Sequence, residues 1–178
     1  FPMTRGEPRG RRPILDPSGE EEWRRACGGV VPDLRTKAQP LRGGADLIII
    51  YNSGRFRMAG RGSTCGLMAY GDANAIAMEI GEFEVLPIVE ETPVICGVHA
   101  SDPRRRMWHW LGKVKDMGFS GVNNFPTHCI VDGQFRQILE EAGMSVKKEF
   151  EMVALARKMD LFTIVYVATP DEAKAMAQ

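Results

Sequence analysis

Four short segments with strand character recur along the chain, and each runs into a polar stretch. They cover residues 45–51, 94–98, 120–124 and 161–167. The first is apolar, rich in β-branched residues and free of polar alternation, which is typical of a strand buried on both faces. The polar, glycine-punctuated residues 52–63 that follow it are predicted to form a loop. The pattern therefore predicts four strands, each ending in a polar loop.

Helical stretches lie between these strands. The predicted helices span residues 73–79, 103–117, 134–142, 146–159 and 170–178. Asp72 and Asp102 are the N-cap candidates of the first two, and Gly118 is the expected C-terminal stop of the second. Gly81 is expected to interrupt the first helix, with residues 84–89 resuming the helix or forming a short strand.

Apolar positions at helical spacing predict which faces are buried. Phe135 and Ile138 are expected to point into the core from the third helix, and Ala154 from the fourth. Thr169 and Glu172, with a proline between them, form the pattern of a capping box at the start of the last helix.

The repeated order of strand, loop and helix predicts an α/β fold with a parallel sheet and right-handed crossovers. Four strands are visible, whereas a closed eight-stranded barrel needs roughly 250 residues. The prediction is a partial (β/α)8 TIM barrel over residues 43–178, incomplete at both ends, with an open sheet or completion by association as alternatives. Residues 1–42 are proline-rich and mixed in charge, and we expect them to be irregular or disordered.

Composition narrows the function classes. With 44% apolar residues the chain can bury a core, and its formal net charge is +0. Balanced charge argues against a general nucleic-acid or membrane-surface binder. No run approaches the length of a membrane span, and we see no signal peptide. The four cysteines are far apart and suggest neither a disulfide framework nor a zinc site, so a cytoplasmic location is expected.

Polar side chains follow the ends of all four predicted strands. The clusters are Tyr51, Asn52, Ser53, Arg55, Arg57 and Arg61 with Asp72 beyond the loop; His99, Ser101 and Asp102; Asn123, Asn124 and Thr127; and Tyr166. Parallel strands present their carboxyl ends at one edge, so these clusters are expected to meet there. The geometric expectation is that Arg55, Asp72, Asp102 and Asn124 share a common rim.

These residue types suit a small anionic oxyacid. Arginine forks and backbone amides bind carboxylate or phosphate, and the Asp72 and Asp102 carboxylates could hold a magnesium ion through waters. Plainer interpretations stay open: both aspartates also serve as helix caps, and Arg57 and Arg61 could simply be solvated. The three arginines at 104–106 are either a solvated face or an anion contact, and the solvated face is favoured.

Several longer motifs resemble a known family. The runs GGADLIIIYNSGRFRMAGRGS, YGDANAI, GFSGVNNFPT, DGQFR and LEEAGM look like the phosphoenolpyruvate hydrolase-like family, also called TIM-barrel signal transduction proteins, whose barrel is similar to that of plant tobamovirus-resistance proteins. The resemblance covers about residues 43–178. It implies a barrel related to phosphoenolpyruvate and phosphonopyruvate enzymes, which act on pyruvate-like oxyacids, usually with magnesium.

The resemblance also implies site roles. The matching positions are Tyr51, Asn52, Ser53, Gly54, Arg55, Asp72, Asn74, Asp102, Asn124 and Thr127. We expect Arg55 to clamp the anion, with Tyr51 or Ser53 orienting the reacting group and Asp72 taking part in catalysis. Substrate contacts are expected from Asn52, Gly54, Arg57, Arg61, Asn124 and Thr127, and magnesium ligands from Asp72 and Asp102. His128-Cys129 departs from the small or aliphatic residues usual there.

Three hypotheses follow. The first is a hydrolase-like enzyme acting on phosphoenolpyruvate or phosphonopyruvate, with magnesium as cofactor. The second is a non-catalytic small-anion-binding or signalling module built on a degenerate barrel. The third is an incomplete gene product with exposed sheet edges that favour aggregation. The expected partner is a small oxyacid, with neither nucleic acid nor membrane, and association into a homo-oligomer is a further expectation.

Overall fold

The computed structural model describes residues 45–177, which form a four-stranded parallel sheet with helices on one side. The strands are β1 (Ile48–Ile50), β2 (Val94–Gly97), β3 (Gly121–Asn123) and β4 (Phe162–Ile164). They pair in chain order, and every pairing is parallel. The predicted α/β class and the four parallel strands are confirmed, in an arrangement consistent with a segment of a (β/α)8 barrel.

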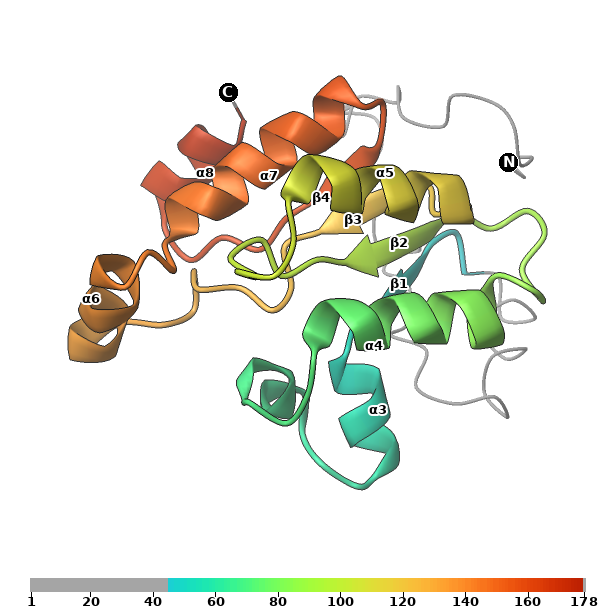
Figure 1. Cartoon of the computed structure of the whole chain (residues 1–178), viewed down its shortest axis with the longest axis horizontal. Coiled ribbons are helices and arrows are strands. Elements are labelled where there is room, and N and C mark those ends of the chain that lie inside the picture. Colours follow the sequence, from blue (N-terminus) through green and yellow to red (C-terminus); the bar gives the residue numbers. More distant parts are fainter. Residues whose placement is uncertain (1–44, 178) are drawn as a thin grey trace.

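Helices connect the strands and cover one face of the sheet, in front of the strands in Figure 1. The connections contain α3 (Ser53–Met58), the 3₁₀ helix η1 (Ser63–Leu67), α4 (Ala73–Glu79), the π-helical turn η2 (Ile80–Val85), α5 (Met107–Met117), α6 (Gly133–Glu141) and α7 (Val146–Lys158), and α8 (Pro170–Met176) follows the last strand. Of these, α4, α5 and α7 pack on the sheet, whereas α6 projects from one end of the molecule (Figure 1).

The core has two parts because strand side chains alternate between the faces of the sheet. Ile48 and Ile50 of β1 point to the helices and join the larger cluster, with Leu111 of α5. Ile49 points the other way and packs with Ile95 in a smaller cluster on the opposite face. Both faces of the strands are therefore apolar, as the lack of alternation predicted.

Several predicted helix signals are confirmed. The Asp72 side chain accepts a hydrogen bond from the Ala75 amide (3.0 Å) at the start of α4. Gly118 ends α5 in the left-handed conformation, with φ of 104°. Thr169 and Glu172 form the complete capping box at the start of α8. Each signal is local in sequence, so no tertiary contact is needed to make it.

Three expectations about helix boundaries were wrong. The predicted loop after β1 contains the helix α3, which its arginines and glycines hide. The helix does not stop at Gly81, because the backbone continues from α4 into the π-helical turn η2. The Leu86 amide donates a hydrogen bond to the Gly81 carbonyl (2.9 Å) across this turn. Helix α5 begins at Met107, and the Asp102 side chain instead accepts from the Arg104 amide (2.9 Å) in the preceding turn.

The predicted burial of the later helices was also partly wrong. Phe135 and Ile138 of α6 are 60% and 56% exposed, and no residue of α6 is buried. Ala154 of α7 is exposed, while Met152 of the same helix is buried. Periodicity gives an apolar side of a helix, but it does not give the orientation of that side relative to the sheet.

The expected irregular segment at residues 1–42 lies outside the described residues. Within residues 45–177, no helix combines the length and the apolar character needed to cross a lipid bilayer.

Candidate functional site

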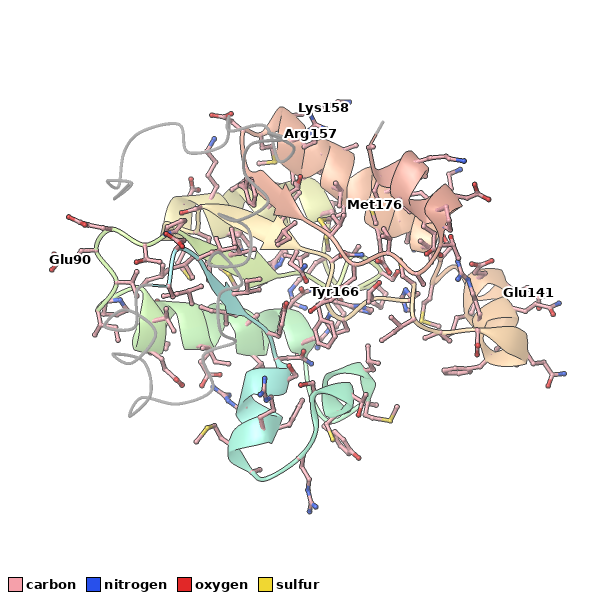
Figure 2. All side chains as sticks on the ribbon, turned by 180° about the vertical axis from the view of Figure 1, so that it is seen from behind. Glu90, Glu141, Arg157, Lys158, Tyr166 and Met176 are labelled. Carbon is pink, nitrogen blue, oxygen red and sulfur yellow. The ribbon has the colours of Figure 1, made fainter. Side chains whose placement is uncertain are left out.

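Polar residues converge at the carboxyl end of the sheet because each strand runs directly into one of the polar segments. Buried Asn52 and Ser53 follow β1, the residues from His99 to Asp102 follow β2, and Asn124 to Thr127 follow β3. In Figure 2, Tyr166, which follows β4, lies near the middle of the molecule. The parallel topology thus brings the ends of all four strands to one edge.

Two asparagines fix the chain just beyond the strands. Asn74 of α4 accepts from the His99 amide (2.8 Å) and donates to the His99 carbonyl (3.1 Å). Asn124 does the same with Tyr166, accepting from its amide (2.6 Å) and donating to its carbonyl (3.0 Å). Each side-chain amide pairs with both the backbone N–H and the backbone C=O of one residue, which a carboxylate cannot do because it has no donor.

Glu149 of α7 is the centre of a buried hydrogen-bond network below the loop after β3. Its carboxylate is 1% exposed and accepts from the Asn124 side chain (2.6 Å), the Thr127 hydroxyl (2.7 Å) and the His128 amide (2.7 Å). A buried carboxylate is tolerated only when donors surround it in this way. Glu149 therefore holds the loop that carries Asn124 and Thr127.

Two histidines meet beside this network. The rings of His99 and His128 are 5.4 Å apart, edge to face, and His128 Nδ1 lies 3.3 Å from a Glu149 oxygen. Burial lowers the pKa of His99, and the contact with the Pro126 carbonyl (3.2 Å) opposes that shift only partly. Burial thus favours the neutral form of His99.

An aromatic group lines the same edge on the face opposite the helices. The Tyr51 and Tyr166 hydroxyls are hydrogen-bonded (3.0 Å), and both rings contact Phe125. Burial, reinforced by the hydrogen bond to Tyr166, raises the pKa of Tyr51 well above its ordinary value. The Tyr51 hydroxyl is therefore a proton-bearing group across the physiological range.

Asp72, Asp102, Arg104 and Arg105 form a charged group that we call the acid–arginine cluster. Arg105 donates to both oxygens of Asp72 (3.0 and 2.7 Å), and it also pairs with Asp102. Arg104 pairs with Asp72 from a more exposed position. Burial alone would raise the pKa of each carboxyl, but hydrogen bonds outweigh it and lower the pKa of both. At Asp72 these bonds come from Arg105 and the Ala75 amide. At Asp102 they come from Asn74, the Arg104 amide and Arg105. The two carboxylates are thus ionised and neutralised by arginine.

The structure brings some of the predicted site residues together. Asp72 and Asp102 both pair with Arg105. The Asn74 side chain donates to Asp102 (3.0 Å) and also accepts from the His99 amide. Arg55 pairs with Glu79 (3.1 Å) of α4 and Glu84 (3.8 Å) of η2. Its expected place on a common rim with Asp72, Asp102 and Asn124 stays a prediction.

The remaining predicted residues near β1 divide by exposure. Asn52 and Ser53 are 2% and 1% exposed, and Asn52 donates to the Gly66 carbonyl (2.9 Å). The Asn52 Oδ1 and Ser53 Oγ atoms are buried without a hydrogen-bond partner. Arg57 and Arg61 are exposed. Buried polar atoms that lack a partner are uncommon, and they point to a group that the polar edge can receive.

Comparison with known proteins decides the family. The family model described as "Phosphoenolpyruvate hydrolase-like" matches residues 28–178. The chain belongs to the phosphoenolpyruvate hydrolase-like family. The match begins upstream of residue 43, where the motifs first showed the resemblance.

Three curated relatives share part of their length with this member of the phosphoenolpyruvate hydrolase-like family. The tomato (Solanum lycopersicum) proteins named ToMV resistance protein Tm-1(GCR237) and ToMV susceptible protein tm-1(GCR26) are each 56% identical over 136 residues, which is 76% of this chain and 18% of each relative. Protein y4pA of Sinorhizobium fredii, whose name assigns it provisionally to transcriptional regulation, is 39% identical over 136 residues, or 76% of this chain and 22% of its own length. The chain therefore spans about a fifth of these relatives.

Magnesium, which the family resemblance implied, fits the acid–arginine cluster poorly as it stands. All four oxygens of Asp72 and Asp102 already accept hydrogen bonds, from Ala75, Asn74, Arg104 or Arg105. No group of three or more histidine, cysteine, aspartate or glutamate side chains in the described part of the chain could hold a metal ion. A divalent cation would have to displace Arg105.

Sequence reasoning missed three members of the site. Glu149 lies in the first turn of α7 and carries no motif, and the solvated face favoured for residues 104–106 does not hold for Arg105. His128 appears in the sequence only as a departure from the family pattern, which gives it no role. The KKEFEMV segment around Glu149 places that glutamate at a buried helical position beside Met152 and Val153. A glutamate on the apolar side of a helix was the signal that could have found it.

Proposed function

We propose that this chain recognises a small anionic oxyacid at the carboxyl end of its sheet, as a hydrolase-like relative of phosphoenolpyruvate and phosphonopyruvate enzymes. Membership of the phosphoenolpyruvate hydrolase-like family supports the substrate class. The observation that carries the proposal is the group of buried polar atoms without partners next to β1, Ser53 Oγ and Asn52 Oδ1. These atoms lie where ligands bind in parallel α/β sheets.

The residues near β1 suit the chemistry of such a ligand. The neutral Tyr51 and Ser53 hydroxyls can donate to a carboxylate or phosphate oxygen without titrating. Arg57 and Arg61 are exposed on the same segment and can attract an anion. In hydrolysis, preorganised donors of this kind would stabilise the charge that develops on the transferred group.

A second candidate is a non-catalytic module that keeps the anion site for recognition or signalling. One observation favours it: Arg105 occupies both carboxylates that the enzyme hypothesis assigns to magnesium. The curated relatives are named for virus resistance or susceptibility and for regulation rather than for a reaction. Association into homo-oligomers would be compatible with either candidate.

Phosphate release from phosphoenolpyruvate and phosphonopyruvate tests the proposal, with magnesium and with EDTA. Turnover that falls at least about tenfold in Ser53→Ala, but not in the control Ser63→Ala on an exposed position of the same segment, would support the enzyme. Thermal stabilisation by either oxyacid without turnover, lost in Ser53→Ala, would support the binding module. Neither turnover nor a thermal shift would refute both candidates.

A further inference from the structure

Arg105 occupies a distinct position in the acid–arginine cluster. Its side chain is 17% exposed and lies 4.4 Å above the ring of Trp110, so it is not a solvated arginine. One edge of the guanidinium bonds both oxygens of Asp72, and Nη1 also reaches Asp102. A planar fork held by two carboxylates and a ring face has little freedom to leave.

The two carboxylates come from separate parts of the chain. Asp72 begins α4, and Asp102 lies in the loop after β2, where Asn74 also bonds it (3.0 Å). Two carboxylates that converge from different elements are an arrangement that commonly holds a divalent cation. Here the positive charge between them belongs to a side chain of the protein itself.

We propose that Arg105 is a built-in cation that takes the place of a divalent metal ion between Asp72 and Asp102, so that this chain does not use magnesium there. Magnesium requires near-octahedral oxygen coordination, and each oxygen of the pair already accepts a hydrogen bond. The proposal deepens the proposed function, since it rests on the same site and makes oxyacid binding there independent of metal.

A titration with Mn²⁺ alone tests the proposal and needs no enzymatic turnover. Binding is measured as the loss of the electron paramagnetic resonance signal of free Mn²⁺. The wild-type chain is expected to bind no Mn²⁺ through this pair, whereas Arg105→Met exposes the two carboxylates and should bind Mn²⁺ at least tenfold more tightly. Adding Asp72→Asn and Asp102→Asn to Arg105→Met should abolish the gain. Arg106→Met removes the same charge from the exposed neighbouring position and should gain nothing.

Two results would overturn the proposal: Mn²⁺ binding by the wild-type chain that Asp72→Asn and Asp102→Asn abolish, or a folded Arg105→Met variant that binds Mn²⁺ no better than wild type. Folding is checked by far-UV circular dichroism. If Arg105→Met unfolds, Arg105→Gln is used in its place because it keeps a hydrogen-bond donor. The same gain in Mn²⁺ affinity is expected of it. The absence of phosphate release would refute the enzyme hypothesis but would not change the outcome of the Mn²⁺ titration. Failure of the enzyme hypothesis and failure of the Arg105 proposal are therefore distinguishable.

Discussion

At the scale of single residues, Glu149 organises more of the candidate site than any residue that the sequence motifs indicate. It holds the Asn124 and Thr127 side chains and the His128 amide at once, and Asn124 in turn holds Tyr166. The network is buried, so every donor in it would lose water and gain nothing if the carboxylate were removed.

We expect Glu149→Gln to lower the free energy of unfolding by about 2–4 kcal/mol, because an amide NH₂ would face donors that need an acceptor. Urea denaturation measures the change. Glu151→Gln, an exposed position on the same helix, should change the value by less than about 0.5 kcal/mol. Equal effects of the two substitutions would contradict a special role for Glu149.

His99 predicts a pH dependence of stability. Its folded-state pKa is lowered from 6.5, mainly by burial and further by His128, while Pro126, Asp102 and Glu149 oppose the shift. A lowered pKa means that the unfolded chain binds the proton first, so its contribution is complete above pH 6.5 and is lost as the pH falls below that value.

We therefore expect the free energy of unfolding to decrease from pH 7 to pH 5, and His99→Gln to reduce that decrease. Urea titrations at the two pH values measure it. His109→Gln, on the exposed side of α5, should leave the decrease unchanged. A wild-type stability that stays constant or rises over this interval would show that His99 is not the controlling group.

At the scale of elements, close packing explains a helix that the sequence appeared to break. A Cβ atom on Gly81 would lie 2.2 Å from Phe119 Cζ, so the glycine lets Phe119 pack against the π-helical turn η2. Gly112 in α5 is different, since its added Cβ would meet only Met159 Cε, at 3.9 Å. The two helical glycines thus offer a matched pair.

Gly81→Ala should destabilise the chain by about 1–3 kcal/mol, because Phe119 or the helix must move. Gly112→Ala should stabilise it by up to about 1 kcal/mol, because alanine favours the helix and the space is free. Thermal denaturation of both variants measures the difference. A stabilised Gly81→Ala variant would mean that Phe119 is not packed against the glycine.

The elements also show what sequence reasoning can reach. The strands and the local caps at Asp72, Gly118 and Thr169 were predictable because apolar runs and capping chemistry are local. Helix α3 was not predictable, since its polar segment lacks apolar periodicity. The late start of α5 was not predictable either, since Asp102 and Arg105 before it bond Asn74 and Asp72, which are distant in the sequence. The same reason hid Arg105 and Glu149, whose partners lie 33 and 25 residues away in Asp72 and Asn124.

At the scale of the whole molecule, β1 and β4 are the edges of the sheet that the described residues form. In β4, the Phe162 amide donates inward to the Ser120 carbonyl (3.1 Å), so the amide of Thr163 faces outward. An edge strand whose outward amides have no backbone partner within residues 45–177 favours pairing with another strand. Pairing of two chains through their β4 edges is therefore the expectation to test.

Thr163→Pro should remove this outward donor and shift the weight-average mass towards the monomer at high protein concentration, with the inward ladder intact. Analytical ultracentrifugation measures the mass. Phe162→Pro removes the inward hydrogen bond to Ser120 instead and should destabilise the fold. Equal self-association of the wild type and Thr163→Pro would exclude the β4 edge as the contact.

The hydrogen bonds that Asn74 makes to the His99 backbone and Asn124 to the Tyr166 backbone also have a consequence for the lifetime of the protein. Deamidation converts asparagine to aspartate, which removes the NH₂ donor and places a negative charge against a peptide carbonyl. At Asn74 or Asn124, that one chemical change would release the chain beyond β2 or β4 and leave the sheet itself in place. Aged protein would then keep its secondary structure and lose the arrangement of its polar edge.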